Sequence, residues 1–575
     1  MSYMGNFKRW LDDPAVDLAT KAELKAIENN DKEIESRFHQ MLSFGTAGLR
    51  GILGAGLAYM NVYTVRYATQ GMADLIIREG NSAQNRGVVI GYDSRHRSDE
   101  FAREAACVLA ANGIRVFLFD ALRPTPELSF AIRHLKAIAG INVTASHNPK
   151  EYNGFKAYWA DGAQLSQSHA RVVSESILSR DIFNDVYTLS YEEAQKTGLI
   201  TIIGQKVDEA YLAAVYEQSV DEESVAAVAQ AFKMVYTPFH GAGYRLVPEI
   251  LRKTGVKNIF LVDKQMTLDG NFPTVKSPNP EEKAGFALAI ELAKQKNADL
   301  ILGTDPDADR VGILVKNKEG EYMPLSGNQV GVMLLDFIIK GLKKKNALPE
   351  NALVIKTVVT TRMADKVAMD NGVSVSNVFT GFRFIGERMK EAEESGDHTF
   401  VFAFEESYGY LKGAYARDKD AVVTSMLIAQ MACAYKRRGL SLYEGMAELY
   451  KEYGHFEEKG ISIVMEGLDG LERMQKLMEK LRGENMTKIA AFEIEKITDY
   501  EKDFILDVKS GEKTPTGLQR SNVLSYDFTD GSSLHIRPSG TEPKIKCYLL
   551  MRGESYEDVM RKTEWLEAAA KDMLS

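Results

Sequence analysis

The sequence predicts an α/β protein of three similar α/β domains with mixed sheets, followed by a C-terminal α+β domain, all arranged around one central cleft. Two observations predict this fold. Short apolar segments alternate with helical segments in three successive rounds, which is typical of βαβ units. Three polar clusters also follow directly after apolar segments. Because open α/β sheets bind ligands beyond the carboxyl ends of their strands, we expect these clusters to meet in one cleft.

Length and composition fit a multidomain globular protein. A chain of 575 residues exceeds what a single core supports, and its 45% hydrophobic and 26% charged residues are ordinary values. The net charge of -9 argues against a broad nucleic-acid-binding surface. No segment approaches the roughly 20 apolar residues that span a bilayer, and residues 1–12 lack the apolar core of a signal peptide. We therefore expect a cytoplasmic protein without nucleic-acid or membrane partners, either a monomer or a dimer.

The cysteines add nothing to this picture. Cys107, Cys433 and Cys547 are odd in number and far apart in the sequence. Such a pattern suggests neither a disulfide framework nor a zinc cluster.

The first predicted domain covers residues 1–205. Its first forty residues are rich in Glu and Lys and predict helix. An amphipathic segment at 100–111 predicts a helix that ends near Gly113, a natural C-cap. Strands are predicted at three short apolar segments: 87–92, 115–119 and 137–143.

The second and third predicted domains, 206–323 and 324–455, repeat this pattern. A helix is predicted at 244–253, ending near Gly255. In the third domain, helices are expected between the strands. The predicted strands are 233–236, 258–262 and 298–303 in the second domain, and 353–359 and 399–404 in the third.

The last predicted domain, 456–575, has a different pattern. Asp530-Gly531 is a hairpin-turn signal between two strand candidates, and a long helix is predicted at 555–573. We expect an antiparallel sheet, with strands at 461–464, 523–528 and 533–536.

The segment Ala145-Ser146-His147-Asn148-Pro149 follows the strand predicted at 137–143. A serine on a polar turn at the end of a strand is a candidate covalent nucleophile. A solvated turn is the alternative, since Ser, His, Asn and Pro all favour turns. The segment lacks the glycines of G-x-S-x-G, and no acidic residue nearby in the sequence orients His147, so an acyl-transfer serine is not supported.

Three aspartates at alternate positions, Asp305, Asp307 and Asp309, follow the strand predicted at 298–303. Their hard oxygens suit Mg²⁺ or Ca²⁺ rather than Zn²⁺. An EF-hand loop is excluded, because its sixth and twelfth positions would hold Arg310 and Lys316. An acidic surface turn is the alternative. Carboxylates packed this closely need a counter-charge, which a cation supplies, and Arg310 would suit a phosphate oxygen beside the metal.

Two further polar clusters could bind a substrate. Glu405 and Ser407 follow the strand predicted at 399–404 and could bind sugar hydroxyls, although a helix N-terminus is the alternative. The segment 537–541 could cradle an anion, with a structural turn as its alternative. In that segment Arg537 offers a bidentate fork, Gly540 allows a close backbone approach, and Ser539 and Thr541 offer hydroxyl donors.

A nucleophilic serine, three carboxylates for a metal, a hydroxyl-binding loop and a separate phosphate cradle together fit phosphoryl transfer on a phosphosugar. A phosphorylated Ser146 would carry nearly two negative charges and could contact the metal. The metal and Arg310 would then stabilise charge on the transferring group.

With these segments, the chain closely resembles the α-D-phosphohexomutases, the family of phosphoglucomutase and phosphomannomutase. Within this family it is most similar to the longer bacterial α-phosphoglucomutases. The resemblance covers nearly the whole chain and implies four domains around one deep cleft. The segments that carry it are 44–51, 144–149, 153–156, 305–310, 380–382, 405–407 and 537–544.

The resemblance implies a role for each matching residue. Ser146 is similar to the family's phosphoserine, and the implied Mg²⁺ ligands are Asp305, Asp307, Asp309 and a Ser146 phosphate oxygen. The residues implied in proton transfer and in binding the reacting group are Arg50, His147 and Lys156. The residues implied in substrate binding are Arg310, Thr380, Gly381, Glu405, Ser407, Lys419, Arg537, Ser539, Gly540 and Thr541.

The reaction implied is an intramolecular phosphotransfer in two halves. Phospho-Ser146 gives its phosphoryl group to a hexose phosphate, and the bisphosphate turns end for end and returns its other phosphate. We expect interconversion of glucose 1-phosphate and glucose 6-phosphate, with glucose 1,6-bisphosphate as intermediate and activator. The fourth domain is expected to close over this intermediate.

The sugar loop departs from the family's frequent Gly-Glu-x-Ser-Gly-His form, since Phe404 replaces the first glycine and Tyr408-Gly409 replaces Gly-His. Mannose and pentose phosphates therefore stay alternative substrates. Two other classes also remain: a phosphatase-like hydrolase, in which water takes the phosphoryl group, and an inactive sugar-phosphate sensor. Dependence on a sugar bisphosphate would argue against the hydrolase, and the complete nucleophile and metal set argues against the sensor.

Overall fold

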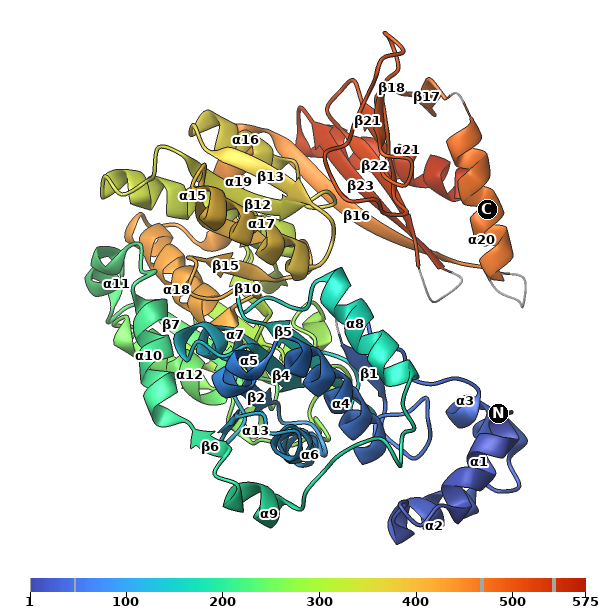
Figure 1. The fold of residues 1–575 in the computed structure, drawn as a ribbon. Helices are drawn as coiled ribbons and strands as arrows, with labels where there is room; N and C mark the ends of the chain where they lie inside the picture. The colour runs from blue at the N-terminus through green and yellow to red at the C-terminus, as the bar shows by residue number, and fades with distance from the viewer. Residues whose placement is uncertain (1, 46–47, 466–469, 485, 540–543, 575) are drawn as a thin grey trace.

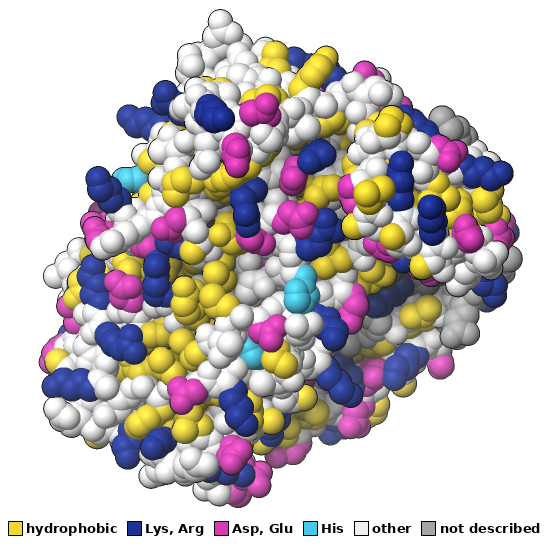
Figure 2. Space-filling view, turned by 90° about the horizontal axis from the view of Figure 1, so that it is seen from below, with side chains coloured by type: hydrophobic (Ala, Val, Ile, Leu, Met, Phe, Trp, Pro, Cys, Tyr) yellow, Lys and Arg dark blue, Asp and Glu magenta, His cyan; other side chains and the backbone are white. Residues whose placement is uncertain are grey.

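The structure is a computed structural model that describes residues 2–45, 48–465, 470–484, 486–539 and 544–574. Four sheets organise these residues into three α/β domains and a C-terminal domain (Figure 1). The fold class predicted from the sequence is confirmed. No helix in these ranges is both long enough and apolar enough to cross a bilayer. Basic and acidic side chains lie interspersed over the face seen in Figure 2.

The first forty residues form three helices rather than one: α1 (Tyr3–Asp12), α2 (Leu18–Ala26) and α3 (Asp31–Phe38). Ser2, Asp17 and Asn30 cap their N-termini, so each helix starts at its own polar residue. Trp10 packs edge-on against Phe38, with ring centroids 5.7 Å apart, which holds this unit together.

The first domain contains a six-stranded sheet of order β1-β5-β4-β2-β3-β6. Strands β4 and β2 are parallel, but β5 is antiparallel to both β4 and β1, so the sheet is mixed. The strands are β1 (Leu49–Ile52), β2 (Val88–Tyr92), β3 (Val116–Phe119), β4 (Ala139–Val143), β5 (Tyr152–Trp159) and β6 (Ile200–Ile203). The helices are α4 (Val62–Arg78), α5 (Asn81–Arg86), α6 (Ser98–Ala111), α7 (Thr125–His134), α8 (Gln167–Leu178) and α9 (Tyr191–Lys196).

The second domain has a five-stranded sheet of order β11-β10-β9-β7-β8, in which β7, β8 and β9 are parallel and β10 returns antiparallel. Its strands are β7 (Lys233–Thr237), β8 (Asn258–Leu261), β9 (Leu300–Thr304), β10 (Val311–Lys316) and β11 (Tyr322–Pro324). Its helices are α10 (Gln205–Tyr216), α11 (Glu222–Val228), α12 (Gly243–Lys253), α13 (Asp263–Met266), the 3₁₀ helix η1 (Lys283–Phe286) and α14 (Ala287–Lys296).

The third domain has a four-stranded sheet of order β13-β12-β14-β15. Its strands are β12 (Ala352–Thr357), β13 (Ser374–Val378), β14 (Thr399–Phe404) and β15 (Tyr410–Lys412). Its helices are α15 (Gly327–Lys344), α16 (Met363–Asp370), α17 (Phe382–Ser395), α18 (Ala421–Arg437) and α19 (Leu442–Tyr453). Strands β12, β13 and β14 are parallel, so their carboxyl ends share one edge.

The C-terminal domain is built on an antiparallel sheet with the main order β16-β23-β22-β21-β18-β19-β20. The hairpin predicted at Asp530-Gly531 is confirmed, since β21 and β22 pair across it and Gly531 has a φ of 86°. The strands are β16 (His455–Val464), β17 (Lys488–Ile489), β18 (Phe492–Asp499), β19 (Phe504–Asp507), β20 (Lys513–Thr514), β21 (Leu524–Phe528), β22 (Ser533–Pro538) and β23 (Lys544–Gly553). The helices are α20 (Gly470–Gly483) and α21 (Tyr556–Leu574).

The buried side chains divide unequally among the domains. One continuous apolar cluster runs from Val89 in the first domain through the second and third domains to Phe456. The C-terminal domain has a separate cluster that includes Leu534, Ile536 and Leu549. The three α/β domains therefore pack as one body, whereas the C-terminal domain folds around its own core, as its separate position in Figure 1 suggests.

Candidate functional site

Ser146 lies in the loop between β4 and β5, and only 4% of its surface is exposed. Its φ of 53° is left-handed, which is uncommon for a residue other than glycine. Its Oγ donates to Asp305 Oδ2 at 2.9 Å and lies 3.2 Å from His147 Nδ1. The structure thus brings the candidate nucleophile of the first domain onto the aspartate cluster of the second.

The aspartate cluster occupies the turn between β9 and β10. The carboxylates of Asp305, Asp307 and Asp309 are buried and offer ligand oxygens that all lie within 4.8 Å of one another. The Lys156 Nζ donates to Asp307 Oδ2 at 2.7 Å and to Asp309 Oδ2 at 3.1 Å. The Lys419 Nζ lies 3.2 Å from Asp309 Oδ2. Both lysines predicted for the site therefore converge on this cluster.

Burial and the two neighbouring carboxylates raise the pKa of Asp305 well above its ordinary value. Burial also opposes ionisation of Asp309, but Lys156 and Lys419 lower its pKa below the ordinary value. Burial would lower the pKa of Lys156, yet Asp307 and Asp309 raise it. Burial, mutual repulsion of the carboxylates and attraction by the lysines therefore act in opposite directions within this cluster.

The residues of this cluster fit a divalent cation. In the part of the chain that the structure describes, Asp307 Oδ1 and Asp309 Oδ1 are buried and have no hydrogen-bond partner. Buried acceptors are normally satisfied, and an all-oxygen donor set is what hard cations bind. The unsatisfied oxygens and the shared geometry of the three carboxylates therefore point to a metal rather than to an acidic surface turn.

Two residues of the site were not predicted from the sequence. Thr125, at the start of α7, donates from Oγ1 to Asp307 Oδ2 at 2.8 Å, and Glu281 accepts from Arg310 Nη1 at 3.1 Å. Thr125 lies 182 positions from Asp307 in the sequence, so no local pattern connects them. Only the packing of the first domain on the second makes this contact.

The cations of the first domain surround the Ser146 loop. Arg50, on β1, donates from Nη1 to Asn148 Oδ1 at 3.0 Å. Burial, together with the charges of Arg310 and Arg50, lowers the pKa of His147 to about 3. The His147 imidazole is therefore neutral near pH 7 in this state.

The Glu405 loop begins where β14 ends. Glu405 Oε1 accepts a hydrogen bond from the Gly381 N–H at 2.8 Å, and Ser407 lies half-buried on the following turn. Burial raises the pKa of Glu405 to about 7, although Lys419 opposes this rise. A backbone bridge joins Arg310 to Gly409, so this loop is tied directly to the aspartate turn.

The candidate phosphate cradle lies at the end of β22. Arg537 Nη1 donates to Thr380 Oγ1 at 2.5 Å, which brings the fourth domain to the third beside the Glu405 loop. The Ser539 N–H donates to the Lys544 carbonyl oxygen at 2.7 Å. Gly540 and Thr541, also predicted for this cradle, lie outside the described residues.

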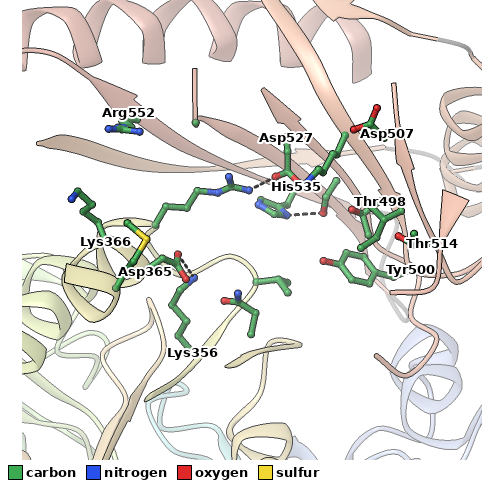
Figure 3. Close-up of a pocket in the computed structure, with 18 of the residues that line it drawn as sticks. Lys356, Asp365, Lys366, Thr498, Tyr500, Asp507, Thr514, Asp527, His535 and Arg552 are labelled. Carbon is green, nitrogen blue, oxygen red and sulfur yellow. Dashed lines mark hydrogen bonds and ion pairs between the residues drawn. The ribbon is translucent and has the colours of Figure 1, made fainter. Parts of the chain in front are cut away.

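A cavity of about 750 Å³ separates the third domain from the sheet of the fourth (Figure 3). Arg362 and Asp527 form an ion pair across it, and Lys356 pairs with Asp365 at 3.1 Å. On its fourth-domain wall, His535 lies between two serine hydroxyls, and burial lowers its pKa to about 3. Both polar and aromatic contacts join the two domains beside this cavity, since the ring centroids of Phe379 and Tyr500 lie 5.1 Å apart.

Comparison with known proteins identifies the family. The phosphoglucomutase/phosphomannomutase models match in chain order: alpha/beta/alpha domain I at 41–182, domain II at 209–320, domain III at 326–453 and the C-terminal domain at 473–561. The chain is 35% identical to a phosphoglucomutase of Staphylococcus haemolyticus over 536 residues, covering 91% of this chain and 93% of that protein.

Two further comparisons agree. A phosphoglucomutase of Staphylococcus epidermidis is 35% identical over 552 residues, covering 95% of this chain and 98% of that protein. The crystal structure of a putative phosphomannomutase of Thermus thermophilus has the same fold, with a TM-score of 0.67, 21% identity and coverage of 93% and 99% of the two chains. The chain therefore belongs to the phosphoglucomutase/phosphomannomutase family.

Proposed function

We propose that this protein is a phosphoglucomutase, which interconverts glucose 1-phosphate and glucose 6-phosphate through phospho-Ser146 and a glucose 1,6-bisphosphate intermediate. The observation that carries the proposal is the 2.9 Å contact between Ser146 Oγ and Asp305, at the edge of a buried three-carboxylate cluster. Relatives that are named phosphoglucomutase and align over more than nine tenths of this chain support the choice of glucose phosphates.

The metal in this proposal is Mg²⁺, held by Asp305, Asp307, Asp309 and an oxygen of the phosphorylated Ser146. When bound, it would neutralise charge on the phosphoryl oxygens that develops during transfer. The hard oxygen donors and the two unsatisfied carboxylate oxygens support this assignment.

In the first half-reaction, the bond between Ser146 Oγ and phosphorus breaks as a sugar oxygen binds that phosphorus. The proton of the sugar hydroxyl needs an acceptor, and His147 lies beside Ser146. With Arg50 and Arg310 nearby, its imidazole is a weak base. A phosphoryl group on Ser146 would add nearly two negative charges there, raise the pKa of His147 and allow it to take the proton, which would then pass to the departing Ser146 Oγ, 3.2 Å from His147 Nδ1.

The remaining predicted residues would bind the sugar phosphate. Glu405 and Ser407 would accept and donate hydrogen bonds to sugar hydroxyls, and Arg537 would hold the phosphate that does not react. Lys156 and Lys419 would neutralise the carboxylates and the transferring group together, since both already contact the cluster. A single sugar loop and a single cradle would thus serve both orientations of the bisphosphate.

Turnover assays test the proposal. With Mg²⁺ and catalytic glucose 1,6-bisphosphate, we expect glucose 1-phosphate to be converted much faster than mannose 1-phosphate or ribose 1-phosphate. A higher rate with mannose 1-phosphate or ribose 1-phosphate would mean that the protein acts on a different sugar phosphate. The proposed phosphoryl transfer through Ser146 would remain the same. Steady release of inorganic phosphate without isomerisation would instead indicate a hydrolase.

A further inference from the structure

Arg95 binds the backbone of the Ser146 loop at four points. It lies in the turn after β2, and its side chain is fully buried. The two Nη atoms donate to the carbonyl oxygens of Ser146, Asn148, Pro149 and Tyr152, at 2.5, 2.5, 2.9 and 3.0 Å respectively. One guanidinium group therefore spans the loop from the candidate nucleophile to the start of β5.

Asp93 holds the other side of the same loop. Its Oδ2 lies 3.2 Å from Arg95 Nε and accepts a hydrogen bond from Thr144 Oγ1 at 2.7 Å. Thr144 Oγ1 in turn accepts from the Ser146 N–H at 2.9 Å. The N–H and the carbonyl group of Ser146 are thus both tied to the Asp93–Arg95 pair.

The second domain covers this pair. The Phe272 ring, itself buried, lies 5.1 Å from the Arg95 guanidinium carbon, a distance typical of a cation–π contact. His96 Nε2 lies 3.0 Å from Asn271 Oδ1, and a Cβ on Gly270 would come within 2.6 Å of the backbone nitrogen of His96. The loop of the second domain therefore sits tightly on the Arg95 turn and keeps water away from it.

These contacts stabilise the backbone conformation of Ser146. A left-handed conformation is unfavourable for a residue with a Cβ and persists only where its surroundings enforce it. Arg95 supplies the enforcing contacts, because its planar fork can bind several carbonyl oxygens at once, whereas an ammonium group cannot span them. The same contacts aim Ser146 Oγ at Asp305.

We propose that Arg95 is a positioning residue for phosphoryl transfer, which fixes Ser146 in its left-handed conformation beside the aspartate cluster while Phe272 seals it. This inference rests on the proposed function, since it concerns the orientation of the phosphorylated Ser146 side chain. Arg95 touches neither the sugar nor the phosphoryl group in this account. In the proposed function, the sugar loop and the phosphate cradle belong to the third and fourth domains and do not contact Arg95, so we expect the affinity for the sugar phosphate not to depend on Arg95.

The test compares Arg95→Lys with Arg180→Lys, which also replaces a domain-one guanidinium that pairs with a carboxylate, that of Asp74. Each full-length protein is phosphorylated with glucose 1,6-bisphosphate, and turnover is expressed per phosphorylated, folded molecule. For Arg95→Lys we expect kcat to fall about 100-fold with KM for glucose 1-phosphate unchanged, the cost of a displaced reacting group. For Arg180→Lys we expect wild-type kcat and KM.

A merely structural role for Arg95 would lower the melting temperature and the folded fraction, but neither changes kcat per phosphorylated, folded molecule. Wild-type kcat in Arg95→Lys, or an equal fall in Arg180→Lys, would overturn the inference and leave the proposed function standing. Absence of turnover in the wild-type protein would overturn the proposed function itself.

A second variant covers the case in which Arg95→Lys does not fold. Phe272→Leu keeps an apolar side chain over Arg95 but removes the aromatic face. We expect a fall in kcat of about tenfold at unchanged KM, the magnitude of a desolvated cation–π contact. Wild-type kcat in Phe272→Leu would then contradict the inference.

Discussion

At the scale of single residues, Ser146 is held by contacts that no stretch of sequence displays. Its hydroxyl donates to Asp305, 159 positions further along the chain. The sequence identified both residues because each stands on a polar turn after an apolar strand. It could not supply Thr125 or Arg95, whose side chains gain their roles only through packing between segments that are distant in the sequence.

Thr125→Val tests the support of the metal site. The substitution removes the 2.8 Å hydrogen bond to Asp307, together with the 2.7 Å hydrogen bond that Thr125 accepts from Asn142, while keeping the side-chain shape. Partners that orient a metal ligand contribute about 10–100-fold to metal affinity, so we expect the Mg²⁺ concentration for half-maximal activity to rise by about that factor. Thr197→Val, whose hydroxyl donates to the Ala194 carbonyl oxygen and accepts from the Leu199 N–H, is the control. An unchanged Mg²⁺ requirement in Thr125→Val would contradict this role.

His535 predicts a dependence of stability on pH. Burial lowers its pKa in the folded protein to about 3, from an ordinary value of 6.5. Between these values the unfolded chain binds more protons, so the contribution is complete above pH 6.5 and is lost as the pH falls toward 3. At pH 5 the loss is about 2 kcal/mol. His147 adds an effect of the same sign.

The measurement is the free energy of unfolding against pH for wild type and His535→Asn. We expect the difference between the two proteins to shrink by about 2 kcal/mol from pH 7 to pH 5, because Asn does not titrate. A difference that stays constant over this interval would mean that His535 has no lowered pKa in the folded protein.

At the scale of elements, the apolar strands of the parallel cores were predictable because each is a short, continuous, buried segment. Several strands were missed for physical reasons. Strand β10 is apolar and buried, but it begins immediately after the aspartate turn and was not separated from that cluster. Strand β18 exposes Glu493, Glu495 and Lys496, so it does not resemble a continuous buried segment. Both strands pair antiparallel with a predicted strand, β10 with β9 and β18 with β21.

Gly327 shows how an element positions the sugar loop. It opens α15, and a Cβ there would lie 2.1 Å from the Glu406 carbonyl oxygen. Gly327→Ala must therefore push the loop away, and we expect a loss of stability of about 1–3 kcal/mol together with a higher KM for glucose 1-phosphate. Gly460→Ala, where nothing lies within 4 Å of the added Cβ, should change neither quantity. A wild-type KM in Gly327→Ala would show that α15 does not set the loop position.

At the scale of the whole molecule, one apolar cluster joins the three α/β domains and reaches the fourth at Phe456, while the fourth domain also has a core of its own. The alternation of strands and helices predicted the number and kinds of domains, while the exact boundaries proposed at 205, 323 and 455 stay a prediction. The relative placement of the fourth domain could not be predicted, because its contacts, such as Arg362 with Asp527 and Phe379 with Tyr500, join side chains that are far apart in the sequence.

This separation predicts a measurable closure. If the fourth domain closes over the bisphosphate, its cradle must approach the aspartate cluster, and the cavity beside Arg362 must change shape. Small-angle scattering with saturating glucose 1,6-bisphosphate should give a smaller radius of gyration than scattering without it. An unchanged scattering profile would argue against closure and for a rigid open cleft.

The central claim is that Ser146 carries the phosphoryl group, and one measurement tests it most directly. Wild-type protein and Ser146→Ala are incubated with Mg²⁺ and radiolabelled glucose 1,6-bisphosphate, and the labelled peptide is sequenced. The account predicts one label per wild-type chain on Ser146, its transfer to added glucose 1-phosphate, and no label or turnover in Ser146→Ala. Label on another residue, or full turnover in Ser146→Ala, would contradict it.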